Sequence, residues 1–290
     1  MTIDLDPVGT LDARTCDRSF EALYRHWERH QWSSLQVDYT VDTASFRRLD
    51  ERAREDLLSI FAHFFVGEFE VARLLAPFLL AAPDYDVQLL LATQVADEHR
   101  HLQSILRVHD EVFGIVGGID VVQAFTADRI EPVAVHLFSA LEQVVRALET
   151  ERDEDSFLRA MIGYHVLTEG SVARANQTLA SRRFPLVGAF PGLVEAQRLA
   201  VRDELRHVGI GICYARRRLA RDPVRARQVI GDLVDTFVQL GEYVVDQALS
   251  DTEGRLAGAY GLDPVTVWTE VQRQLRLRLR AIGLEAVGAA

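Results

Sequence analysis

The pentapeptide DEHRH at residues 97–101 returns almost unchanged as DELRH at residues 203–207. Both copies read Asp-Glu-x-Arg-His, and both lie inside long stretches with helical periodicity. Residues three positions apart share one face of an α-helix, so the Glu and the His of each copy can reach a single point. The duplicated pentapeptide therefore predicts two Glu-x-x-His pairs on two different helices.

Each pentapeptide has a partner upstream. Glu68 and Glu169 both open the pattern Glu-x-x-Val-Ala-Arg, and each precedes the Glu of the next pentapeptide by a similar interval. If a turn lies midway, antiparallel helices of about 15 residues, or roughly 23 Å, return the second motif to the level of the first. Two such hairpins would bring together the ligand set of a dinuclear metal site in a four-helix bundle. The six predicted metal ligands are Glu68, Glu98, His101, Glu169, Glu204 and His207.

Charge favours the same interpretation. Four carboxylates in a core repel one another and lose hydration, and two divalent cations would compensate their charge. Oxygen and imidazole ligands suit iron or manganese better than a structural zinc site. Asp97 and Asp203 are the alternative ligands, although carboxylates in such places more often orient a ligating His. His99, His109, His136 and His165 are expected to be ordinary core or surface histidines.

Composition narrows the function class. The 290 residues carry a net charge of −11, which argues against a nucleic-acid partner. Cys16 and Cys213 form no disulfide framework, so we expect a cytoplasmic protein. The acidic start of the chain lacks the pattern of a secretion signal, and no apolar run is long enough to predict a transmembrane segment.

Helical periodicity extends along the chain, and no strand pattern stands out. Asp50 is expected to cap a long helix, and Pro77 to kink or stop it. The predicted fold class is all-α, with a ferritin-like four-helix-bundle core and additional flanking helices. We expect a single domain over 1–290, with a loose leader at 1–12, a metal-binding core at about 48–220 and C-terminal helices at about 223–283.

These motifs resemble the ribonucleotide reductase small-subunit superfamily of ferritin-like proteins, and within it the ligand-binding oxidases that resemble that subunit. The likeness covers roughly residues 32–218 and includes FVGE at 65–68, YHVLTE at 164–169 and RDE at 202–204. The resemblance implies that the six ligands hold Mn and Fe, or two Fe, and that O2 is the oxidant. It also implies that Asp203 is the carboxylate tied to a ligating His and that Trp32 is its tryptophan neighbour.

The resemblance further implies an ether cross-link that the protein makes itself. Val71, three positions after Glu68, matches the valine whose β-carbon becomes bonded, and Tyr164, five before Glu169, matches the tyrosine that supplies the oxygen. The radical tyrosine of ordinary reductase subunits would fall at Ile105, which argues against a conventional reductase subunit. Relatives of this kind imply a homodimer, an unidentified electron donor, and a long-chain fatty acid or similar apolar carboxylate as the ligand for C–H oxidation.

Two alternatives stay open. A di-iron mono- or N-oxygenase of specialised metabolism would use the same ligands. Arylamine oxygenases of this superfamily have an extra His, whereas the corresponding position here is Ala200. A non-enzymatic protein that binds metal or lipid would have the same motifs and would consume no O2.

Overall fold

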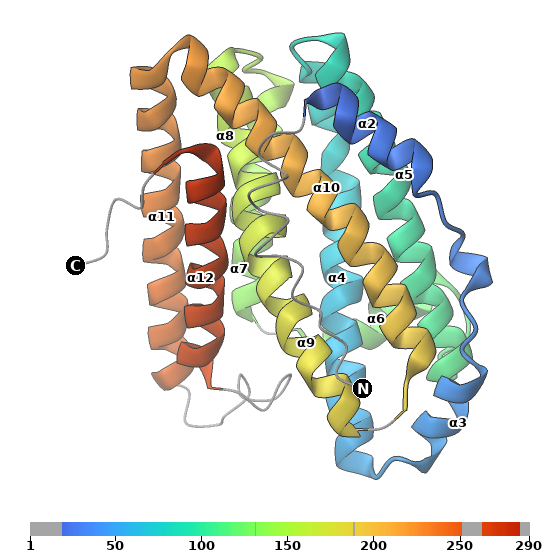
Figure 1. The fold of residues 1–290 in the computed structure, drawn as a ribbon. Helices are drawn as coiled ribbons and strands as arrows, with labels where there is room; N and C mark the ends of the chain where they lie inside the picture. Colours follow the sequence, from blue (N-terminus) through green and yellow to red (C-terminus); the bar gives the residue numbers. More distant parts are fainter. Residues whose placement is uncertain (1–18, 131, 188, 251–262, 285–290) are drawn as a thin grey trace.

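The computed structural model describes residues 19–130, 132–187, 189–250 and 263–284, so the predicted leader at 1–12 and Cys16 lie outside the described residues. Every regular element within these ranges is helical, which confirms the all-α prediction (Figure 1). The elements are α2 (Phe20–Arg29), η1 (Ser34–Gln36), α3 (Thr40–Arg48), α4 (Glu51–Ala81), α5 (Tyr85–Arg107), η2 (Val108–Val112), α6 (Ile119–Ala127), α7 (Pro132–Arg146), η3 (Ala147–Glu149), α8 (Glu154–Met161), η4 (Ile162–Ala173), α9 (Arg174–Val187), α10 (Pro191–Arg221), α11 (Pro223–Ser250) and α12 (Pro264–Ile282).

Two helical hairpins form the core of the bundle. Helix α4 packs against α5, and the η4 segment, which joins α8 to α9, packs against α10. Asp50 caps α4 by accepting a 2.8 Å hydrogen bond from the N–H of Ala53, as predicted. Asp84 caps α5 by accepting one of 3.1 Å from the N–H of Val87. These caps satisfy backbone donors that have no partner within the helix, and they fix where each helix of the hairpin begins.

The start of α10 is fixed by a carboxylate from another helix. Asp42 of α3 is fully buried and accepts hydrogen bonds of 2.9 and 2.8 Å from the N–H groups of Gly192 and Leu193. An added Cβ at Gly192 would lie 2.5 Å from the carbonyl oxygen of Asp38, so only glycine allows this close approach. Helix α3 thereby sets the position of the helix that carries the second pentapeptide.

The expected stop or kink at Pro77 does not end α4, which continues to Ala81. Proline removes one backbone donor from the helix, which weakens it locally. Leu74, Leu75 and Phe78 around it are nearly or fully buried, and the burial of these side chains offsets that loss. Tertiary packing therefore overrides the local signal.

The stretch around Glu169, where the sequence predicts a regular helix, differs from that prediction. Its middle, η4, is a π-helix of 12 residues that begins at Ile162. Side chains satisfy carbonyl groups along this wide helix: the hydroxyls of Thr168 and Ser171 donate to the carbonyls five residues earlier, at 2.9 and 2.7 Å. The buried Arg278 of α12 adds a 3.1 Å hydrogen bond from Nε to the carbonyl of Gly170. Since π-segments inside helices are frequently found at functional sites, η4 marks a region of interest.

The other helices flank this core, as predicted. Helix α2 packs against α5 and α10, while α12 packs against η4 and α9, and α11 lies beside α12 (Figure 1). The short helices α3 and α6 fall in stretches whose sequence reads as connecting segments, so periodicity does not reveal them. No helix in the described ranges has the length and apolar character needed to cross a bilayer. The single domain over 1–290 stays a prediction.

Candidate metal centre

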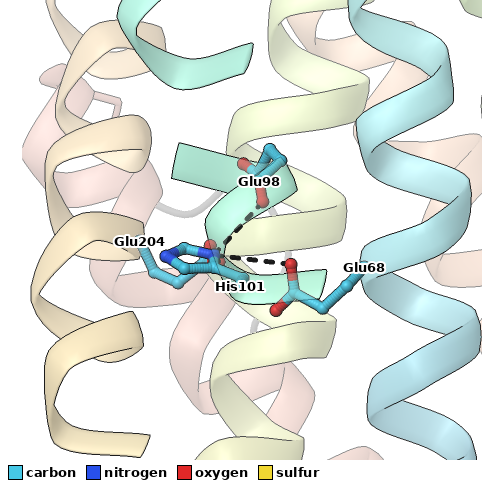
Figure 2. Close-up of side chains that lie close together, drawn as sticks. All are labelled: Glu68, Glu98, His101 and Glu204. Carbon is cyan, nitrogen blue, oxygen red and sulfur yellow. Dashed lines mark ion pairs between the residues drawn. The ribbon is translucent and has the colours of Figure 1, made fainter. Parts of the chain in front are cut away.

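Six side chains from four elements meet in the middle of the bundle. Glu68 comes from α4, Glu98 and His101 from α5, Glu169 from η4, and Glu204 and His207 from α10. Their ligand-type atoms fall into two overlapping groups that could each hold a metal ion, with atoms no more than 4.8 Å apart in each. The first group is Glu68, Glu98, His101 and Glu204, which Figure 2 shows converging on one point; the second is Glu98, Glu169, Glu204 and His207.

The two groups share Glu98 and Glu204, so these two carboxylates lie between two adjacent candidate cation positions. Nδ1 of His101 lies 3.4 Å from Oε2 of Glu68, 3.4 Å from Oε2 of Glu98 and 3.3 Å from Oε1 of Glu204. On the other side, Nδ1 of His207 lies 2.9 Å from Oε1 of Glu98. Both imidazoles therefore turn the same ring nitrogen toward the carboxylates.

The chemistry of these atoms fits a pair of bound cations. Five of them are buried and lack a hydrogen-bond partner, although leaving a buried polar group unsatisfied costs roughly 1–3 kcal/mol. Lone pairs that converge in a buried core are what a divalent cation requires, and the oxygen and imidazole set suits iron or manganese. The five atoms are Oε2 of Glu68, Glu98 and Glu169 and Nδ1 of His101 and His207.

Electrostatics show how strongly the cluster needs positive charge. Burial raises the pKa of Glu68 to about 8, although the adjacent His101 opposes this shift. Burial, together with the charges of Glu204 and Glu98, raises the pKa of Glu169 well above its usual range. Burial lowers the pKa of His207, but the charge of Glu98 outweighs it and the pKa rises to about 9. The cluster thus holds protons at neutral pH that bound cations would displace.

Each imidazole is oriented by an aspartate from the opposite pentapeptide. Nε2 of His101 lies 3.3 Å from Oδ2 of Asp203, which also accepts a 2.7 Å hydrogen bond from the indole of Trp32. Asp203 therefore contacts both His101 and Trp32. Since Nε2 faces the aspartate, Nδ1 is left to face the carboxylate cluster.

The second imidazole has a matching set of contacts that sequence reasoning missed in part. Nε2 of His207 lies 3.2 Å from Oδ2 of Asp97, which is fully buried. Neither Asp97 nor Asp203 belongs to the two groups of ligand-type atoms. Asp97 accepts hydrogen bonds from the indole of Trp27 at 2.9 Å and from Nη2 of the buried Arg206 at 2.6 Å. Arg206 is the fourth residue of its pentapeptide, as Arg100 is of the other, and Arg100 contacts both Asp97 and Asp203. The Arg that both pentapeptides share could have pointed to the role of Arg206, whereas Trp27 lies outside the repeated sequence.

Val71 and Tyr164 lie next to each other at the side of the cluster. Tyr164 is fully buried, and its hydroxyl donates a 3.1 Å hydrogen bond to the carbonyl oxygen of Val71. Burial, together with the charge of Glu98, raises the pKa of this phenol well above its usual value, so the hydroxyl keeps its proton. Phe78 covers the Tyr164 ring edge-on, with ring centroids 5.4 Å apart.

An apolar cavity of about 460 Å³ reaches the cluster. Its polar end is formed by Glu68, Glu169 and Glu204, and the side chain of Glu68 keeps 15% exposure. Away from the carboxylates the walls are mainly aliphatic and aromatic side chains from α4, α7, α11 and α12. The flanking C-terminal helices therefore enclose a space that starts at the candidate metal centre.

Comparison with known proteins places the fold. No known protein-family model matches the sequence. Among solved structures, the chain is similar to a valine-to-alanine mutant of an R2-like ligand-binding oxidase with anaerobically reconstituted Mn/Fe cofactor. The two chains are 21% identical and superpose with a TM-score of 0.78, and the match covers 91% of this chain and 93% of that one. It is also similar to the R2-like ligand-binding oxidase from Sulfolobus acidocaldarius, at 20% identity and a TM-score of 0.76, covering 93% and 92%. The chain therefore has the ferritin-like fold of R2-like ligand-binding oxidases, as the sequence motifs indicated.

Proposed function

We propose that this protein is an O2-dependent oxidase with a dinuclear metal centre, containing Mn and Fe or two Fe. The observation that carries the proposal is the set of five buried, unpartnered ligand atoms within two groups that share Glu98 and Glu204. Bound metals would supply the capacity to reduce O2 and to oxidise a C–H bond. Glu68, Glu98, His101, Glu169, Glu204 and His207 would hold them.

The residues of this chain prepare the site in three ways. Asp97 and Asp203 fix the two imidazoles with Nδ1 inward. Arg206 and Arg100 compensate the charge of these aspartates, so the metals need to neutralise only the carboxylate ligands. Five of the six candidate ligands are buried, which strengthens the electrostatic contacts at the centre.

Within this function we propose that Val71 and Tyr164 form an ether cross-link. The Tyr164 hydroxyl already contacts the Val71 backbone, and both residues are buried beside the carboxylates. In this step the phenolic O–H and the β-carbon C–H bonds break and a C–O bond forms. Two protons and two electrons leave the protein, and O2 accepts them.

The cavity supports a substrate with a long apolar part and one charged end. A fatty acid would place its chain along the apolar walls and its carboxylate beside Glu68 and Glu204, where bound metals would neutralise it. A cavity of about 460 Å³ lies within the usual range for small-molecule sites, which is roughly 300–1,000 Å³. We therefore propose a long-chain fatty acid or a similar apolar carboxylate as the ligand.

The test is reconstitution of metal-free protein with Mn(II) and Fe(II), in air and under anaerobic conditions. We expect O2 consumption and, only in air, an intact mass lower by two hydrogens that maps to the peptides with Val71 and Tyr164. An unchanged mass would remove the cross-link. Metal binding without O2 consumption would instead favour a carrier of metal or lipid.

A further inference from the structure

A buried polar pair beside the candidate metal centre does not belong to the ligand set. Gln94 and His165 are both fully buried, and Gln94 lies one helical turn before Glu98 on α5. The amide Nε2 of Gln94 donates to Oε1 of Glu169 at 2.8 Å and to Oε1 of Glu98 at 3.3 Å. Its carbonyl Oε1 lies 2.9 Å from Nε2 of His165. One amide therefore connects two candidate ligands to a histidine.

The orientation of this amide follows from its neighbours. Carboxylate oxygens accept hydrogen bonds, so the amide NH₂ of Gln94 must face Glu98 and Glu169, and its carbonyl oxygen must face His165. Burial lowers the pKa of His165 to about 3, so the ring is neutral and has one N–H. We assign that proton to Nε2, because its contact with Oε1 of Gln94 is shorter, at 2.9 Å, than the 3.2 Å contact of Nδ1 with the carbonyl of Met161. His165 thus donates to Gln94, which donates to the carboxylates.

The His165 ring is itself held in place by a close helix approach. A Cβ added at Gly211 of α10 would lie only 2.4 Å from the Cβ of His165. Glycine inside a helix costs about 1 kcal/mol relative to alanine, and here it makes room for the imidazole. The ring of Phe78 packs edge-on against His165, with centroids 5.8 Å apart. Contacts with α4 and α10 therefore hold the ring of His165, which lies on η4, next to Gln94.

The shorter hydrogen bond of Gln94 goes to a ligand of only one of the two candidate cation positions. Glu169, which belongs only to the group with His207, is held at Oε1 by Gln94. Glu68, which belongs only to the group with His101, is contacted at Oε2 by Nδ1 of His101 at 3.4 Å, and its side chain is 15% exposed, compared with 2% for that of Glu169. The two terminal carboxylates of the centre therefore differ in how firmly the protein holds them.

We propose that Gln94 is a positioning residue that His165 locks in one orientation, and that it fixes Glu169 so that the cation position with His207 is the tighter one. The inference rests on the proposed two-metal function. Removing a hydrogen-bond partner of a metal ligand typically weakens metal affinity by about 10- to 100-fold. The position with His101 depends on Gln94 only through the longer contact to Glu98, so its affinity should change little.

The test uses Gln94→Met, which keeps the length of the side chain and removes the donor. Metal-free protein is titrated with Co(II) alone under anaerobic conditions, and visible absorption reports the two binding steps. We expect the tighter step to weaken by about 10- to 100-fold and the weaker step to stay within about twofold. Anomalous scattering from Co(II)-soaked crystals should show lower occupancy beside Glu169 than beside Glu68. Gln88→Met, at an exposed position of the same helix, is the matched control.

Gly211→Ala provides a second variant that alters neither Gln94 nor a ligand. We expect it to weaken the same Co(II) step, and the double variant with Gln94→Met to be no weaker than the worse single variant, because both act through one chain of contacts. Unchanged or equally weakened steps in Gln94→Met, or additive losses in the double variant, would overturn the proposal. If unaltered protein binds no Co(II), it is the dinuclear function that fails. Thermal unfolding of each metal-free variant checks that the fold is intact.

Discussion

His101 is oriented by Asp203, although the two residues lie in opposite halves of the chain: Nε2 of His101 and Oδ2 of Asp203 are 3.3 Å apart. The reverse contact joins His207 to Asp97 at 3.2 Å. Each pentapeptide thus supplies the aspartate that holds the histidine of the other. The two hairpins cannot move apart without releasing both imidazoles, so the fold and the candidate metal centre depend on the same contacts.

Asp203→Asn should weaken metal binding without unfolding the protein. The amide has the shape of the carboxylate but lacks its charge, so it holds the His101 imidazole less firmly and lowers its basicity as a ligand. We expect metal affinity to fall by about 10- to 100-fold in an anaerobic Mn(II) titration. Asp110→Asn, at an exposed position of η2, is the control and should bind like the unaltered protein. Equal affinities for the Asp203 variant and the control would show that the contact has no role in metal binding.

Tyr164→Phe should abolish the cross-link and leave metal binding in place. Phenylalanine keeps the ring that packs against Phe78 but has no oxygen to join to Val71. After reconstitution in air, intact-mass measurement should show no loss of two hydrogens. Tyr214→Phe, which also alters a buried tyrosine, should retain the loss. A loss of two hydrogens that persists in Tyr164→Phe would place the oxidation at another residue.

His109 should make folding stability depend on pH. It is fully buried, and burial lowers its pKa below the ordinary value of about 6.5. The unfolded chain therefore takes up a proton at His109 as the pH falls through about 6.5, while the folded protein does not, so stability is lost on acidification. We expect His109→Phe, whose ring can pack against Phe65 and Phe113, to reduce the slope of unfolding free energy between about pH 7 and pH 5. His99→Gln, at an exposed position, is the control and should leave the slope unchanged. An unchanged slope in His109→Phe as well would count against this account.

Asp42→Ala should destabilise the protein at the start of α10. The substitution leaves the buried N–H groups of Gly192 and Leu193 without an acceptor. Loss of a helix cap costs roughly 0.5–2 kcal/mol, and two buried donors place the expected loss near the upper end of that range. Urea unfolding of the metal-free protein measures it. A change below about 0.5 kcal/mol would mean that water replaces the carboxylate.

The sequence is most informative where residue spacing alone determines geometry. Residues at positions i and i+3 of a helix must share a face, so the amino-acid order itself pairs Glu98 with His101 and Glu204 with His207. The distance between each lone Glu and its pentapeptide indicates hairpins, and the folded chain brings the six residues together.

What the sequence does not reveal depends on contacts between distant segments. Trp27 lies 70 positions before Asp97, and nothing near it in the sequence announces the hydrogen bond between them. The π-helical turn at η4 depends partly on Arg278 of α12, more than a hundred residues away. Gln94 and His165 cannot be recognised as a pair for the same reason, since each is an unremarkable residue on its own helix. Pro77 stays inside α4 because packing outweighs its local preference.

Anomalous X-ray scattering from crystals of the protein reconstituted with Mn(II) and Fe(II) tests the central claim most directly. Data collected on both sides of the Mn and Fe absorption edges identify each metal and its position. We predict two adjacent peaks, one bounded by Glu68 and His101 and the other by Glu169 and His207, with Glu98 and Glu204 in contact with both. The absence of anomalous density at this cluster, or a single metal bound at another place in the molecule, would contradict the account.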